Sequence, residues 1–337
     1  MTLKISIYGL GNFGYALLKH LDNKNNHKIE IFAYDRNEIL MKYLKKYRRH
    51  LFLHKSIKIS QKICLTNDIG TLLEDCDVLI MAINSESTRD VIKKIKKFLN
   101  KKIIIVNTAK AIDYKTGNRL SELFYEQIPK RKFSYSILAG GTIAKDLFHH
   151  EPLGADIACK NKNDLKILKN LFEAPNLKIY TTTDLTGVEY ASAFKNIIAI
   201  MAGIINGMNF SFGSETHVIS RSAYEIQKII LKRGGKMSTF KTNSQSWTND
   251  LWMSCMGNSR NREFGKLLGK GLKVNQAILI MKNQRKTVEG INTLKGINES
   301  KISKEYPLLN FLYRLIIKKS TNIDELKTMI VSNQNKL

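Results

Sequence analysis

The sequence predicts an α/β protein in which a doubly wound, mostly parallel sheet is followed by an all-α domain. Three observations support this class. A glycine-rich turn follows the first strand, apolar strand-like runs alternate with helical patterns in the first half, and almost only helical periods follow Asp184. The predicted domains are therefore residues 1–183 and 184–337. At 337 residues the chain is long enough for two separate cores.

The first predicted strand, residues 4–8, runs directly into a glycine-rich turn and then into apolar positions at helical spacing. GxGxxG between a strand and a helix is typical of a Rossmann-type domain, where the backbone approaches a dinucleotide pyrophosphate at the helix N-terminus. The predicted cofactor-binding residues of this turn are Gly9, Gly11, Asn12, Phe13 and Gly14. The second strand, 28–34, ends at Asp35, where such folds place the carboxylate that binds ribose. This favours NAD, although Arg36 offers a charge for the 2′-phosphate of NADP.

The rest of the first half continues the alternation. Continuous apolar, β-branched runs at 77–83 and 102–107 are typical of buried parallel strands. The other predicted strands are 134–139, 155–159 and 177–182, and the predicted helices are 86–99 and 163–173. Residues 37–70 are strongly basic and show no clear period. After Asp184 the predicted helices are 186–208, 215–233, 261–268, 274–283 and 306–318.

The helix predicted at 186–208 is apolar nearly all the way round, so we expect it to be the buried spine of the second domain. Thr186 and Glu189 form a capping-box pattern at its start. Gly203 interrupts the apolar run, and no transmembrane segment is expected. The helix contains Lys195, and burial of an ammonium lowers its pKa toward the range where it exchanges protons. Most lysines of a basic chain are simply solvated, so only other motifs can give Lys195 a role.

Composition excludes several function classes. The formal net charge is +26, but Lys and Arg are spread along the whole chain without a nucleic-acid-binding signature, so no nucleic-acid partner is expected. The four cysteines and the seven histidines show no metal-ligand spacing, and no metal site is expected. The cysteine pattern favours reduced thiols and a cytoplasmic protein.

A series of motifs, in order along nearly the whole chain, resembles the NAD(P)-dependent glycerol-3-phosphate dehydrogenase family. The motifs are Gly9–Gly14, Asn107–Lys110, Asp184–Glu189, Ala193–Asn196, Thr239–Phe240, Asp250–Leu251, Ser259–Arg262 and Glu289–Gly290. The segments around Lys195 and Arg260 are the most specific. The resemblance implies reversible hydride transfer between C2 of sn-glycerol 3-phosphate and C4 of nicotinamide, with dihydroxyacetone phosphate as the oxidised partner. It also implies a role in supplying glycerol 3-phosphate for phospholipid synthesis.

The resemblance further implies individual roles. Lys195 is the proton acceptor and donor, Lys110 lies near substrate and nicotinamide, and Asp250 orients Lys195 and the substrate. Arg260 offers a planar fork to the phosphate, and Asn261 adds neutral donors. The implied substrate-binding residues are Lys110, Gly140, Thr142, Lys195, Asp250, Ser259, Arg260 and Asn261. Beyond the glycine-rich turn and Asp35, the implied cofactor-binding residues are Lys110, Ala144, Arg260 and Glu289.

Three loops depart from the family pattern. The turn at 139–144 lacks the family's proline and phenylalanine, the stretch 244–249 has no glycine, and the segment 211–215 differs as well. The charged and amide residues that bear chemistry are all present, which favours a working but divergent enzyme. The expected partner is a small phosphorylated substrate, and a homodimer is compatible with the sequence.

Two alternatives remain at this stage. A beta-hydroxyacid-type dehydrogenase also joins a dinucleotide domain to helices with a catalytic lysine, but it would not need the phosphate fork at Arg260. A non-catalytic dinucleotide-binding protein would fit the high charge and the changed loops, but it would not need both Lys195 and Asp250.

Overall fold

The computed structural model describes residues 2–24, 28–53, 56–284, 286–297 and 305–332. The chain forms two compact units. The first contains Met1–Ala109 and Leu120–Leu185, and the second contains Lys110–Arg119 and Thr186–Leu337.

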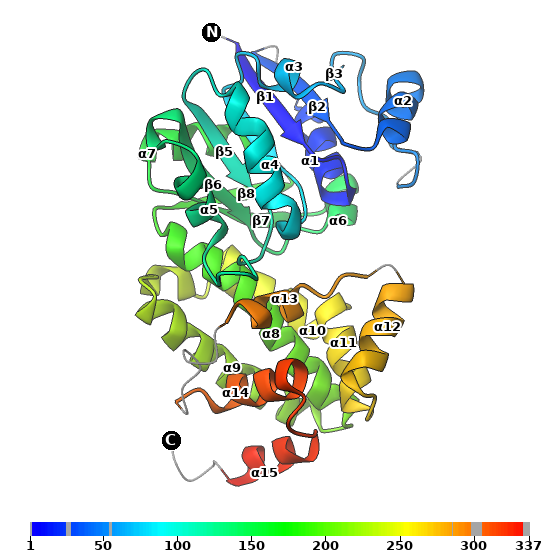
Figure 1. The fold of residues 1–337 in the computed structure, drawn as a ribbon, viewed down its shortest axis with the longest axis vertical. Coiled ribbons are helices and arrows are strands. Elements are labelled where there is room, and N and C mark those ends of the chain that lie inside the picture. The colour runs from blue at the N-terminus through cyan, green and yellow to red at the C-terminus, as the bar shows by residue number, and fades with distance from the viewer. Residues whose placement is uncertain (1, 25–27, 54–55, 285, 298–304, 333–337) are drawn as a thin grey trace. The chain divides into compact units, whose positions relative to one another are not determined.

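The first unit is built on an eight-stranded sheet in the order β3-β2-β1-β4-β5-β6-β7-β8 (Figure 1). All neighbouring strands pair parallel except β6 and β7, which are antiparallel. The strands are β1 (Leu3–Tyr8), β2 (Ile29–Tyr34), β3 (Cys64–Leu65), β4 (Val78–Met81), β5 (Ile103–Asn107), β6 (Phe133–Ala139), β7 (Leu153–Cys159) and β8 (Leu177–Thr182). The strand order changes direction at β1, so the switch point, where such sheets bind ligands, lies between the carboxyl ends of β1 and β4. The predicted Rossmann-type class is confirmed.

Seven α-helices accompany this sheet among the described residues. They are α1 (Asn12–Asn23), α2 (Glu38–Tyr47), α3 (Ile69–Leu73), α4 (Thr88–Ile95), α5 (Leu120–Gln127), α6 (Ala144–Phe148) and α7 (Lys162–Phe172). The basic stretch that the sequence left without a pattern, 37–70, contains α2, β3 and the start of α3. The two-residue strand and the five-residue helix are too short to show a period.

The second unit is helical. Its helices are α8 (Leu185–Gly207), α9 (Phe212–Lys232), α10 (Asp250–Met256), α11 (Arg260–Gly269), α12 (Val274–Asn283), α13 (Glu289–Gly296), α14 (Pro307–Tyr313) and α15 (Asp324–Ser332). Within the described chain, α8 is the one helix long and apolar enough to cross a membrane, and its most apolar window is fully buried inside the fold. Burial inside the unit is what a core helix requires, and α8 is the predicted spine.

Helices α8 and α11 touch backbone to backbone through glycines on both sides. A Cβ added at Gly265 of α11 would lie 2.0 Å from the carbonyl oxygen of Ile200, and one added at Gly203 of α8 would lie 2.0 Å from that of Arg262. Both distances are far below any contact that a real Cβ makes. Because neither helix can shift without a clash or a gap, this contact fixes their register.

Residues 110–119 belong to the second unit, whereas the sequence assigned them to the first. Ile112 is buried in the second unit's core, and Arg119 pairs with Glu189 of α8 at 3.2 Å. Gly117 has φ +71° and approaches the backbone of α13 so closely that a Cβ there would lie 2.0 Å from the Gly296 carbonyl oxygen. Residues 110–119 have no periodicity, so their tertiary contacts alone decide where they belong.

The expected capping box at the start of α8 is wrong. The helix begins at Leu185, before Thr186, and the carboxylate of Glu189 faces Arg119.

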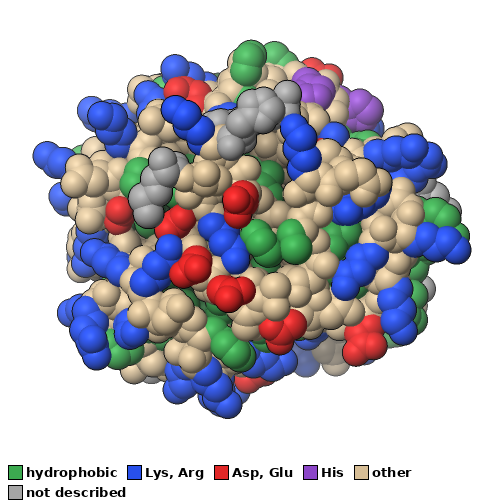
Figure 2. Space-filling view, turned by 90° about the horizontal axis from the view of Figure 1, so that it is seen from above, with side chains coloured by type: hydrophobic (Ala, Val, Ile, Leu, Met, Phe, Trp, Pro, Cys, Tyr) green, Lys and Arg blue, Asp and Glu red, His purple; other side chains and the backbone are tan. Residues whose placement is uncertain are grey.

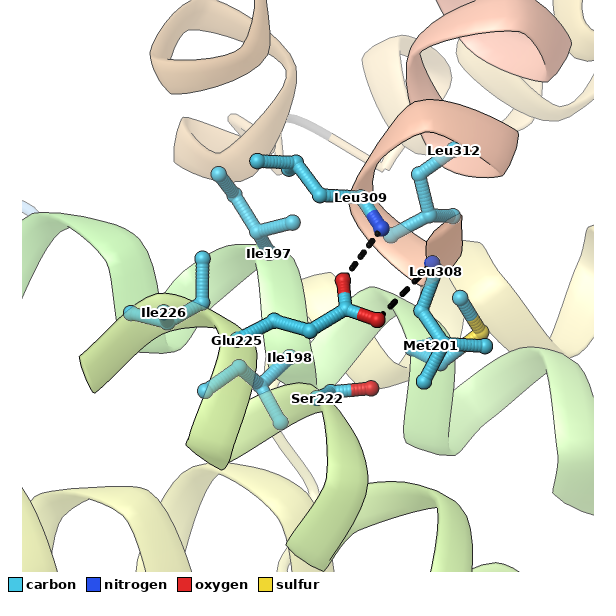
Figure 3. Close-up of a pocket in the computed structure, with 9 residues that line it drawn as sticks. All are labelled: Ile197, Ile198, Met201, Ser222, Glu225, Ile226, Leu308, Leu309 and Leu312. Carbon is cyan, nitrogen blue, oxygen red and sulfur yellow. Dashed lines mark hydrogen bonds between the residues drawn. The ribbon is translucent and has the colours of Figure 1, made fainter. Parts of the chain in front are cut away.

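A small cavity of about 10 Å³ lies between α8, α9 and α14, with a buried carboxylate beside it (Figure 3). Glu225 of α9 accepts hydrogen bonds from the backbone N–H groups of Leu308 and Leu309, at 3.1 and 3.0 Å, and so caps α14. Pro307, at the first position of α14, has no N–H to satisfy. Burial of the carboxylate outweighs these hydrogen bonds and raises the pKa of Glu225 to about 7.

The charge of the chain is distributed rather than gathered. Figure 2 shows Lys and Arg side chains scattered over one face of the molecule, with acidic side chains between them. Among the described residues, no group of three or more His, Cys, Asp or Glu side chains is arranged to hold a metal ion.

Candidate functional site

The centre of the candidate site is a buried carboxylate that holds two ammonium groups. Asp250, the first residue of α10, is fully buried. Its Oδ1 accepts a hydrogen bond from Lys195 Nζ at 2.7 Å, and its Oδ2 accepts one from Lys110 Nζ at 2.8 Å. Lys195 Nζ also donates to Ser254 Oγ at 2.6 Å. The structure therefore brings together the three residues to which the sequence assigned catalysis.

The two lysines differ in their surroundings. Lys195 comes from the middle of the spine helix, and its side chain is 5% exposed, whereas the Lys110 side chain is 17% exposed. Burial lowers the pKa of Lys195, and the charge of Lys110 lowers it further, while Asp250 opposes both effects. A buried amine held near a carboxylate can exist with or without its proton, which is what an acid–base group requires.

A chain of amide hydrogen bonds continues from the lysine pair. Asn196 Nδ2 lies 3.4 Å from the Lys110 carbonyl oxygen and 3.4 Å from Glu289 Oε2. Asn261 Nδ2 donates to Asn196 Oδ1 at 3.0 Å, and Asn261 Oδ1 accepts from the N–H of Gly290 at 2.9 Å. These bonds tie α8, α11 and α13 together around the site. They are possible because the glycine contact between α8 and α11 places Asn196 opposite Asn261.

Arg260 and Ser259 mark the start of α11. The Arg260 guanidinium is half exposed and lies 3.5 Å from Glu289 Oε1. Ser259 is the N-cap, since its Oγ accepts from the N–H of Arg262, and it also donates to the Ser254 carbonyl oxygen at 2.6 Å. The hydroxyl of Ser259 is thus used in holding the helix.

The position of α11 is secured from its other face. Arg262 pairs with the buried Glu215 of α9 at 2.7 Å, and Asn206 of α8 donates to the same carboxylate at 3.1 Å. This buried pair anchors the helix turn that carries Arg260.

The glycine-rich turn lies in the first unit, between β1 and α1. A Cβ at Gly14 would lie 2.0 Å from the Gly9 carbonyl oxygen, and one at Gly9, where φ is +98°, would lie 2.6 Å from the Ala82 carbonyl oxygen. These two glycines are required by packing. Gly11 is different, because a Cβ there would meet nothing within 4 Å. Its lack of a side chain leaves open space above the N-terminus of α1, which fits a pyrophosphate against the backbone.

The carboxylate of Asp35 lies at the end of β2, next to this turn. Its Oδ2 accepts from the N–H of Leu10 at 2.7 Å, and its Oδ1 accepts from the N–H of Asn37 at 2.8 Å. Each oxygen keeps a lone pair that can accept from a ribose hydroxyl. Arg36 is exposed beside it. The residues present therefore fit a dinucleotide.

The other predicted residues of the first unit follow β6. Gly140 adopts φ +151°, its carbonyl oxygen accepts from the N–H of Thr142 at 2.7 Å, and Ala144 begins α6. Asn12 and Phe13 lie in the first turn of α1.

Sequence reasoning missed Ser254 and did not include Asn196 among the site residues. Ser254 follows Asp250 by four residues, and residues at this spacing share one face of a helix. That signal was present, but α10 was not predicted as a helix, since it has only seven residues.

Comparison with known proteins agrees with these features. Profiles described as the N-terminus and the C-terminus of NAD-dependent glycerol-3-phosphate dehydrogenase match residues 4–165 and 184–327. A Clostridium botulinum protein named glycerol-3-phosphate dehydrogenase (NAD(P)+) is 30% identical over 329 residues, which cover 96% of each chain. One of the same name from Fusobacterium nucleatum is 28% identical over 335 residues, 98% of each chain. The crystal structure of glycerol-3-phosphate dehydrogenase from Coxiella burnetii covers 98% of this chain and 99% of its own, with TM-score 0.85 and 20% identity. The chain therefore belongs to the NAD-dependent glycerol-3-phosphate dehydrogenase family of oxidoreductases.

Proposed function

We propose that the protein interconverts sn-glycerol 3-phosphate and dihydroxyacetone phosphate with NAD(P), and that Lys195 moves the proton. The observation that supports this most strongly is the buried Asp250 carboxylate, which holds one ammonium on each oxygen. Two cations on a single buried anion leave a net positive charge. That charge suits the oxyanion that develops when a ketone is reduced.

A nicotinamide coenzyme, when bound, would supply the hydride in one direction and accept it in the other. In the reduction, Lys195 donates its proton to the C2 oxygen as hydride arrives at C2. In the oxidation, the neutral amine of Lys195 takes the C2 hydroxyl proton. Lys110 stabilises negative charge on the same oxygen, and Asp250 keeps both amines in place. Ser254 fixes the direction of the Lys195 amine through the 2.6 Å hydrogen bond.

The phosphate of the substrate is assigned to Arg260 and Asn261. A guanidinium can donate two parallel hydrogen bonds to phosphate oxygens, and the Arg260 side chain is sufficiently exposed to receive an incoming dianion. One N–H of Asn261 is engaged with Asn196, and we assign its second N–H to the phosphate. Gly140 and Thr142 are proposed as further substrate contacts.

NAD is the proposed preferred coenzyme, held by the glycine-rich turn with Asp35 on the ribose. A carboxylate there repels the 2′-phosphate of NADP by about 1–2 kcal/mol, enough for roughly tenfold discrimination. Ala144, Lys110, Arg260 and Glu289 are the remaining proposed coenzyme contacts. The four cysteines are free thiols, which is compatible with the cytoplasmic location that we propose. A role in supplying glycerol 3-phosphate for phospholipid synthesis is proposed together with the reaction.

The decisive experiment is NADH oxidation by the purified protein with dihydroxyacetone phosphate or with dihydroxyacetone. We expect turnover with the phosphorylated ketone, little with the other, and lower kcat/KM with NADPH. Lys195→Met should lower the rate by at least about 10²-fold, whereas Lys282→Met, at an exposed lysine of α12, should not. Equal rates with both ketones would mean that the site does not recognise the phosphate. NADH binding without turnover of either ketone would point to the beta-hydroxyacid-type alternative with another substrate or to a non-catalytic binding protein, and turnover of a beta-hydroxyacid would separate these two.

A further inference from the structure

The glycine-rich turn is held from both sides at Leu10. On one side, Asp35 accepts the N–H of Leu10. On the other side, the carbonyl oxygen of Leu10 lies 2.9 Å from Nε2 of His50. His50 follows α2 in the chain, 40 residues beyond Leu10, and is only 3% exposed.

The hydrogen bonds of His50 define its protonation. A carbonyl oxygen can only accept, so Nε2 must carry a proton and donate it to Leu10. Nδ1 faces the backbone N–H groups of Phe52 and Leu53 at 3.2 and 3.1 Å, so it must be the acceptor. The imidazole is therefore neutral, with both nitrogens engaged. The ring of Tyr15 packs edge-on against it, with 5.2 Å between centroids.

Holding the carbonyl of Leu10 has a direct consequence for Gly11. The peptide between them is planar and trans, so its C=O and its N–H point in opposite directions. When His50 fixes the carbonyl, it also fixes the direction of the Gly11 N–H. Gly11 is the N-cap of α1 and the one glycine of this turn that faces open space.

We propose that His50 is a positioning residue for the coenzyme: its imidazole orients the Leu10–Gly11 peptide so that the turn is preorganised for the pyrophosphate. The inference rests on the proposed binding of NAD(H) at this turn. A turn that is already ordered loses less conformational entropy when the ligand binds, so the effect of His50 should appear in the dissociation constant of the coenzyme.

Two substitutions separate the two ends of the imidazole. In His50→Gln, the amide nitrogen can occupy the place of Nε2 and still donate to Leu10, but the acceptor for Phe52 and Leu53 is lost. In His50→Asn, the amide oxygen can replace Nδ1 as that acceptor, but the donor to Leu10 is lost. Each variant removes part of a buried hydrogen-bond set, so both should lower the midpoint of thermal unfolding by similar amounts.

The chain also supplies a matched control. His20 of α1 is likewise buried, and its Nε2 lies 2.7 Å from the Phe172 carbonyl oxygen, but it does not contact the glycine-rich turn. His20→Asn should therefore lower thermal stability without changing coenzyme binding.

The measurement is the dissociation constant of NADH by titration calorimetry with the full-length protein, without substrate. We expect His50→Asn to bind about tenfold more weakly than wild type, and both His50→Gln and His20→Asn to stay within about threefold. Equal weakening in both His50 variants would mean that His50 acts only on stability, and unchanged binding in both would mean that it does not orient the turn. Either result overturns the inference while leaving the proposed function intact. If wild type itself binds no NADH, the proposed function fails, and the inference fails with it.

Discussion

The charge of Asp250 should set the protonation state of Lys195, and Asp250→Asn tests this with almost no change in size. Each ammonium lies 2.7–2.8 Å from one carboxylate oxygen. At an effective dielectric constant of about 20, Coulomb's law gives about 6 kcal/mol for unit charges at this distance, before desolvation and the repulsion between the lysines are subtracted. Removing one partner of a buried ion pair typically costs about 3–5 kcal/mol. Part of this free-energy cost is avoided if Lys195 loses its proton and becomes neutral.

The consequence is a pKa of Lys195 that falls in the variant, because Asp250 is the main group that raises it against burial. Reduction of dihydroxyacetone phosphate needs the protonated amine, so its kcat/KM should begin to decline at lower pH than in wild type. Oxidation of glycerol 3-phosphate needs the neutral amine, so its rise with pH should also begin earlier. At neutral pH we expect the reduction rate to fall by about 10²-fold or more.

The assay is a pair of pH profiles, one for each direction of the reaction, with Ser254→Ala as control. Ser254 accepts from the same amine but carries no charge, so its removal should move both profiles much less. If the profiles of Asp250→Asn stay in place or move to higher pH, Asp250 does not control the proton on Lys195.

Three further substitutions test the phosphate contact, the helix packing and the buried carboxylate. Arg260→Lys replaces a bidentate hydrogen-bond donor by a point charge. The KM for dihydroxyacetone phosphate should therefore rise about tenfold or more, with a smaller change in kcat. An unchanged KM would mean that the phosphate binds elsewhere. In urea unfolding, Gly265→Ala should lower the free energy of unfolding by about 3 kcal/mol, because the new Cβ would lie 2.0 Å from the Ile200 carbonyl oxygen. At Gly213 a Cβ would meet only Ser211 Oγ, at an ordinary contact distance of 3.9 Å, so Gly213→Ala should raise that free energy by about 0.5–1 kcal/mol. Similar effects of the two substitutions would contradict the close contact at Gly265. The pKa of Glu225 is raised from its usual 4.5 to about 7, so between these pH values the folded protein holds a proton that the unfolded chain has lost. As the pH rises from 4.5 to 7, the free energy of unfolding of the wild type should therefore fall by about 3 kcal/mol relative to that of Glu225→Gln. If the two proteins show parallel curves of unfolding free energy against pH, the burial argument is wrong.

The sequence by itself determined the fold class and most of the regular elements. The strands of the sheet are apolar runs, and long helices such as α8 carry a clear period, so local pattern was enough to find them. It also predicted the residues around which the site is built, because Lys195, Asp250 and Arg260 stand in motifs that resemble one family. Short elements such as α10 escaped, since seven residues give fewer than two helical turns.

Only the tertiary structure decided how these residues act on one another. That Asp250 holds Lys195 on one oxygen and Lys110 on the other depends on contacts 55 and 140 residues apart in the chain. Such contacts are fixed by the packing of segments that lie far apart in the chain, and no local period encodes them. The same holds for residues 110–119, whose place in the second unit follows from contacts with α8 and α13 alone. The local sequence identifies the helices, the strands and the reactive side chains. The protonation states of these side chains and their hydrogen-bond partners depend on which of them the fold buries together.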